Sequence, residues 1–82
     1  MTKKDFLERY QIENLKIGEY IMVLDKVTDD PLVMGCALDE GVWKVYKTKE
    51  RGGYYVIKDF KTENEAFDYF YELVLSFHKR RN

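Results

Sequence analysis

The 82-residue sequence contains one cysteine, one proline and one histidine. Cys36 has no second cysteine and no nearby histidine, so it offers neither an internal disulfide, nor a zinc site, nor an activated thiolate. His78 stands beside Lys79, where a positive neighbour suits a surface residue better than a general base. We therefore expect no metal, no cofactor and no enzymatic activity.

Long hydrophobic runs are also missing. The longest uninterrupted apolar stretch is only a few residues, whereas a membrane-spanning helix needs roughly 20. The N-terminal segment, residues 1–5, runs into charge instead of a signal-peptide core. Together with the single cysteine, these features predict a cytoplasmic protein with no membrane segment.

Hydrophobic residues make up 45% of the sequence, aromatic residues 16% and charged residues 35%. This composition is too apolar for a disordered chain, and the length suffices for one modest core. We expect a single domain over residues 1–82, ending in a basic tail at residues 79–82.

The net charge of −1 conceals three segments of different sign. Residues 5–41 carry nine acidic side chains against three basic ones, and residues 62–77 carry four acidic side chains and no Lys or Arg. Residues 42–61 reverse the balance, with six basic side chains against two acidic ones. The pattern fits either internal neutralisation between neighbouring elements or a two-signed surface that docks a partner.

The pattern of residue types predicts a helix, a sheet and a second helix. Thr2 can cap a helix over residues 3–10, and β-rich segments separated by turn residues follow at 19–27, 32–38, 42–48 and 54–60. Because the connections between them are short, successive strands should pair antiparallel. We expect an α+β fold, in which both helices pack on one face of an antiparallel meander of three or four strands.

The C-terminal helix has the clearest sequence signature. Thr62 and Glu65 have capping-box spacing, and Phe60 can act as a hydrophobic staple against Ala66. An apolar stripe at helical spacing follows: Ala66, Phe67, Phe70, Leu73, Val74 and Phe77. This stripe should lie on the sheet, against Trp43 and Val45, which share one face of their strand. Tyr46 should then lie among lysines on the opposite, exposed face.

Interface residues are expected where amphipathic and charged side chains gather around flexible turns. The turn at Gly52 and Gly53 and its flanking strands contribute Tyr46, Lys47, Lys49, Arg51 and Tyr54. If the interface lies elsewhere, the acidic turns with Asp29, Asp30, Asp39 and Glu40 are the next candidates, although these residues are typical turn formers rather than a catalytic pair. The alternative interpretation is that the glycines only make a turn and the lysines only protect sheet edges.

Several segments resemble one protein family. They are residues 43–46 (WKVY), residues 50–52 (ERG), Phe60 with the helix start at residues 62–66, residues 69–73, and the opening residues 3–10 (KKDFLERY). These segments lie within residues 3–10 and 43–73, about half of the chain, and they resemble the small immunity proteins of bacterial polymorphic-toxin systems, above all the immunity protein 59 family. The segment 28–39 does not match that pattern.

The resemblance implies a protein that binds the C-terminal domain of a cognate toxin and blocks it stoichiometrically, without chemistry and without nucleic acid or membrane. Two alternatives stay open. One is a general protein-interaction or adaptor domain. The other is a module like the double-stranded-RNA-binding domain, although the acidic residues Glu63 and Glu65 at the helix start would repel phosphate.

Overall fold

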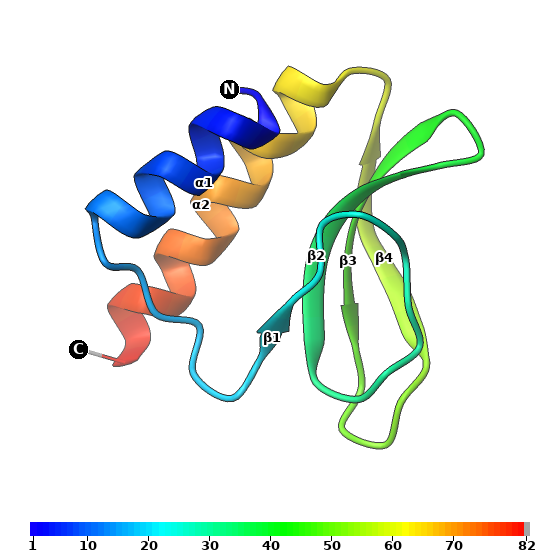
Figure 1. Ribbon diagram of the computed structural model, residues 1–82. Coiled ribbons are helices and arrows are strands. Elements are labelled where there is room, and N and C mark those ends of the chain that lie inside the picture. The colour runs from blue at the N-terminus through cyan, green and yellow to red at the C-terminus, as the bar shows by residue number, and fades with distance from the viewer. Residues whose placement is uncertain (82) are drawn as a thin grey trace.

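The computed structural model describes residues 1–81 and shows two helices and a four-stranded sheet (Figure 1). In chain order the elements are α1 (Lys3–Ile12), β1 (Ile21–Met22), β2 (Val33–Asp39), β3 (Val42–Thr48), β4 (Tyr54–Phe60) and α2 (Glu63–Arg81). The α+β class is confirmed, and the last three strands lie within a residue of their predicted bounds.

The sheet follows the chain in the order β1-β2-β3-β4. Strands β2, β3 and β4 form the predicted antiparallel meander, with Cys36 opposite Val45 and Trp43 opposite Phe60. The prediction of a fully antiparallel sheet is wrong for β1, because β1 pairs with β2 in parallel through Ile21 and Met22 alone. The expected strand at 19–27 is therefore only two residues long.

Residues 23–32 leave the sheet and cross over the face that the helices do not cover (Figure 1). Val23 and Val27 pack there against Val33, Ala37 and Tyr46 as a second, smaller hydrophobic cluster. Two apolar residues of the segment 19–27, which the sequence predicts as a strand, thus pack on this face of the sheet. Residues 23–32 cross this face and return to the end of the sheet at which β1 begins. Strand β2 can therefore run parallel to β1 after a short connection.

Both helices begin at the predicted caps. The Thr2 hydroxyl accepts from the Asp5 amide while the Asp5 carboxylate accepts from the Thr2 amide, which completes a capping box. At α2 the Thr62 hydroxyl accepts from the Glu65 amide at 3.3 Å and donates to the Glu65 carboxylate at 2.9 Å. The basic residues predicted as a tail lie in the last turn of α2, which continues to Arg81, while Asn82 lies outside the described residues.

The main core lies between the sheet and α2. Phe67, Phe70 and Val74 of α2 are fully buried, and Val45 and Cys36 face them from the sheet. Trp43 packs edge-on against Phe67 with ring centroids 5.9 Å apart, which confirms that Trp43 and Val45 face the helices. This stripe on α2 is the reason that the helix lies flat on one side of the sheet.

The position of α1 leaves part of the sheet edge uncovered. Helix α1 packs on α2 through Phe6, whose ring is 5.0 Å from that of Phe70. Within the described residues, no Cα atom of α1 comes within 8 Å of a Cα atom in a strand. Space therefore remains between α1 and β1. Neither helix is long and apolar enough to cross a membrane, as far as the structure describes the chain.

Candidate interaction surface

The predicted interface residues divide into two groups at opposite ends of the sheet. Lys49, Arg51 and Tyr54 surround the β3–β4 turn, whereas Asp39 and Glu40 form the β2–β3 turn. Strands of seven residues separate the two ends by roughly 20 Å. The nine predicted residues therefore do not make one site.

Asp29 joins the first acidic turn to the β3–β4 turn. Its backbone oxygen accepts from the Gly53 amide at 2.9 Å, and its carboxylate accepts from the Tyr54 amide at 3.1 Å. A Cβ atom at position 52 would lie 3.0 Å from the Asp29 oxygen, and Gly52 has φ of +94°. The two glycines thus permit both the tight turn and the close approach of the acidic loop.

The exposed residues brought together in this way form what we call the hairpin-end surface: Asp29, Asp30, Lys49, Arg51 and Tyr54. It carries two carboxylates and two cationic side chains, with no ion pair among them within the described residues. Sequence reasoning treated the acidic and basic groups as alternative interfaces, but the structure places them side by side.

Two predicted contact residues point elsewhere. The expectation that Tyr46 is exposed is wrong, because its ring is fully buried beneath residues 23–27. Its hydroxyl donates to the backbone oxygen of Lys26 at 2.8 Å, and burial raises its pKa to about 12. Lys47 lies on the helix side of the sheet, where its ammonium is 4.6 Å from the ring centroids of both Tyr20 and Phe77. Tyr46 is therefore a core residue, and Lys47 supports the helix face.

The other acidic turn is engaged with its own hairpin. The Asp39 carboxylate accepts from the Lys44 ammonium at 2.7 Å, and this bond raises the pKa of Lys44. Glu40 is exposed at the tip, with φ of +51°. Asp39 thus stabilises the β2–β3 hairpin, whereas Glu40 forms no ion pair within the described residues.

The hairpin-end surface continues onto an apolar strand edge that sequence reasoning missed. Tyr54, Tyr55 and Val56 are consecutive residues of β4 with exposed fractions of 42%, 43% and 39%. Strand alternation predicts that one face of such a run is buried, but β4 is an edge strand and the neighbouring layers do not extend over this part of it. An exposed apolar segment on an edge strand is typical of sites that bind another protein.

The residue types that could support catalysis are dispersed or enclosed. Cys36 is fully buried, and burial raises the pKa of its thiol to about 12. The Nδ1 atom of His78 accepts a hydrogen bond from the Lys16 amide at 3.1 Å. This bond links residues 13–18 to α2. Within residues 1–81, no group of three or more His, Cys, Asp or Glu side chains could hold a metal ion.

Comparison with known proteins identifies no relative. No protein-family model, no curated protein and no solved structure matches the chain.

Proposed function

We propose that this protein is a cytoplasmic immunity protein, which binds the toxin domain encoded beside it and blocks that domain by stoichiometric contact. The resemblance described above motivates the class of partner. The observation that carries the proposal is the hairpin-end surface and its continuation on β4, where charges of both signs adjoin three consecutive exposed apolar residues. Inhibition by contact requires a surface of this kind and no reaction chemistry.

The two parts of the surface have different roles in binding. Arg51 and Tyr54 are residue types that often dominate interface energetics, because a guanidinium and an aromatic ring combine apolar contact with directed hydrogen bonds. Asp30 and Lys49 are exposed at the rim, where charges mainly steer the encounter and select the partner. The Asp29 carboxylate already holds the Tyr54 amide, so the loop and the turn are organised before binding.

The edge of β4 offers main-chain groups as well. In an antiparallel ladder every second amide points to the same side, and the Tyr54 amide points away from β3 toward Asp29. The Val56 amide, two residues on, therefore also points away from β3. A toxin segment lying beside β4 could accept from it while covering the exposed side chains.

A nucleic acid is a poorer fit to the same geometry. The first turn of α2 carries Glu63 and Glu65, and the Glu63 carboxylate accepts from the Lys3 amide at 2.8 Å. Acidic side chains therefore occupy the helix start at which a module like the double-stranded-RNA-binding domain would grip phosphate. The proposal accordingly names a protein partner.

Co-expression with the neighbouring toxin domain tests the proposal. The parent protein should protect host cells, whereas Arg51→Glu combined with Tyr54→Ala should lose protection while still unfolding in one cooperative transition. Lys4→Glu combined with Ile12→Ala is the matched control, since it also reverses one exposed charge and trims one exposed apolar side chain, but on α1. If the parent never protects, the function is wrong; if the hairpin-end variant protects fully, the location is wrong.

A further inference from the structure

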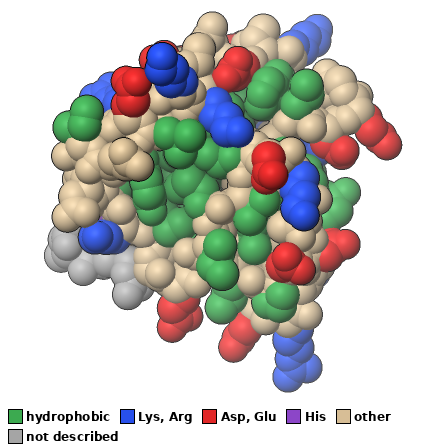
Figure 2. All heavy atoms as spheres, viewed as in Figure 1, with side chains coloured by type: hydrophobic (Ala, Val, Ile, Leu, Met, Phe, Trp, Pro, Cys, Tyr) green, Lys and Arg blue, Asp and Glu red, His purple; other side chains and the backbone are tan. Residues whose placement is uncertain are grey.

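A groove lies between α1 and β1, at the edge of the sheet opposite to β4. Two adjacent hollows of about 710 and 520 Å³ make up this groove, and they share Tyr10, Gln11 and Met22 as lining residues. The groove arises because α1 packs on α2 and not on the sheet. Figure 2 shows hydrophobic side chains gathered in a hollow between the helices and the sheet, with Lys and Arg side chains near its rim.

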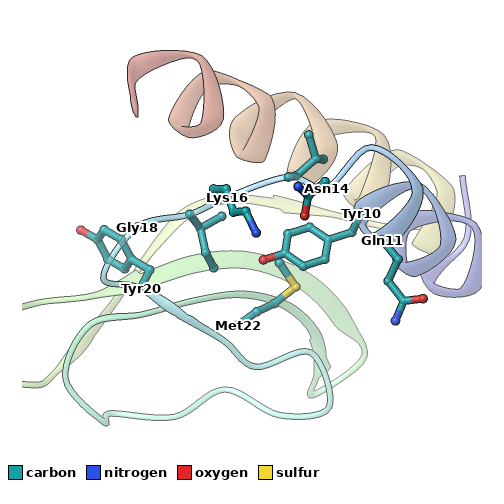
Figure 3. A pocket seen from close by; sticks show the side chains of 9 residues that line it. Tyr10, Gln11, Asn14, Lys16, Gly18, Tyr20 and Met22 are labelled. Atoms are coloured by element: carbon teal, nitrogen blue, oxygen red, sulfur yellow. The ribbon is translucent and has the colours of Figure 1, made fainter. Parts of the chain in front are cut away.

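Apolar side chains line the groove from both sides, and polar side chains such as Gln11 and Asn14 lie among them. Leu7 and Tyr10 contribute from α1, Leu15 and Ile17 from the link that follows, and Met22 and Leu24 from β1 and the residues after it. In Figure 3 the side chains of Tyr10, Lys16 and Met22 point toward one another across the first hollow. An extended segment of apolar character would therefore find contacts on both sides.

Strand β1 is the edge strand beside this groove, and its residue Met22 lines both hollows. The amides of Ile21 and Val23 donate to β2, at 2.8 Å to the Leu32 oxygen and at 3.2 Å to the Met34 oxygen. Since successive residues of a strand direct their main-chain groups to opposite sides, the amide and carbonyl of Met22 point away from β2. An incoming strand could pair with both groups and extend the sheet by one strand beyond β1.

The charge of the lining specifies the incoming segment further. Lys16 is exposed at the rim of the first hollow, which has no acidic lining residue. In the second hollow Lys3 is accompanied by Asp25. Neither ammonium group forms an ion pair within the part of the chain that the structure describes. The Lys16 end of the groove is thus complementary to a carboxylate, whereas the Lys3 end is balanced.

From these features we infer that the groove binds an extended protein segment as an added strand along β1, with an Asp or Glu side chain of that segment beside Lys16. The inference does not rest on the proposed immunity function, because it concerns a different surface, at the other edge of the sheet. It assigns the molecule a second binding site, formed by α1, the link at residues 13–20 and β1.

A selection from a randomised library of capped seven-residue peptides, with the purified protein alone as the target, tests the inference. We expect selected peptides with alternating apolar residues and an acidic residue near one end. Their binding should shift the amide resonances of Lys16 and Met22 and leave those of Arg51 and Tyr54 unmoved. A selection that yields no binder, or binders that map outside the groove, overturns the inference.

Changes of charge and of peptide hydrogen bonding then distinguish strand addition from nonspecific apolar binding. Replacing the acidic residue of a selected peptide by lysine, or introducing Lys16→Glu in the protein, should each weaken binding by about tenfold or more. N-methylation of the peptide amides that face β1 should abolish binding, because it removes the ladder hydrogen bonds without changing the protein. Lys79→Glu, an exposed charge reversal on α2, is the matched control and should leave affinity unchanged. Equal affinity for the parent and Lys16→Glu, or for methylated and unmethylated peptide, contradicts the inference.

Discussion

Tyr46 on β3 lies directly opposite Gly35 on β2, and its ring takes the space that a side chain at position 35 would need. A Cβ atom at Gly35 would lie 2.0 Å from the Val23 oxygen and 2.8 Å from the Tyr46 ring. The Tyr46 hydroxyl in turn donates to the Lys26 oxygen at 2.8 Å. This pair is what allows residues 23–27 to lie close on the second face of the sheet.

Gly35→Ala should therefore destabilise the protein by at least about 2 kcal/mol, because the Val23 backbone must move and the Tyr46 hydrogen bond is lost with it. Gly41→Ala is the contrast. Unlike Gly35, Gly41 has a positive φ, of +78°, but an added Cβ meets nothing within 4 Å, so the substitution should cost about 1 kcal/mol. Urea unfolding of both variants measures the difference. Equal losses of stability for the two variants would mean that residues 23–27 do not pack closely against Gly35.

Much of the fold follows from local signals that the sequence displays openly. The caps at Thr2 and Thr62 fix where the helices begin, and the stripe through Phe67 and Phe70 fixes which side of α2 is buried. The turn at Gly52 and Gly53 fixes the last hairpin. Each of these features depends on residues close together in the chain, which is why periodicity and turn chemistry predict them.

The second face of the sheet could not be predicted in the same way. Strand alternation correctly places Tyr46 and Val45 on different faces of the sheet. It does not reveal that Val23 and Val27 cover the face on which Tyr46 lies. A loop has no period, so its path depends on contacts made only after folding. For the same reason Asp29 and Arg51, 22 positions apart in the chain, were not expected at one surface.

Phe70→Ala should lower the free energy of unfolding by about 3–5 kcal/mol, since its ring is fully buried between Phe6 and Phe67 and no neighbour can refill the space. Leu38→Ala removes a comparable apolar side chain that is 53% exposed, and should cost less than about 1 kcal/mol. Chemical denaturation compares the two variants. A small loss of stability for Phe70→Ala would mean that the side of α2 that carries Phe70 does not face the core.

Alkaline pH should destabilise the protein through two buried groups. Burial raises the pKa of Cys36 from 9.0 to about 12 and that of Tyr46 from 10.0 to about 12. Above pH 9 the unfolded chain loses these protons while the folded chain keeps them, so ionisation favours unfolding as the pH rises toward 12. The urea midpoint should therefore fall between pH 8 and pH 10.5.

Two variants test whether the buried phenol of Tyr46 contributes to this fall in stability. Tyr46→Phe should reduce it, whatever the variant costs at neutral pH, because the phenol is no longer present to ionise. The exposed Tyr55→Phe should retain the full fall. If Tyr46→Phe and the parent lose stability equally with rising pH, then the buried phenol does not contribute to the alkaline transition.

Binding of the toxin domain encoded by the neighbouring gene to the hairpin-end surface can be measured with purified proteins. Calorimetric titration of that purified domain with this protein tests the proposed binding most directly. The account predicts one-to-one binding with a dissociation constant in the nanomolar range or tighter, and a loss of about tenfold or more for Arg51→Glu. Absence of binding by the folded parent protein, or unchanged affinity of Arg51→Glu combined with Tyr54→Ala, would contradict it.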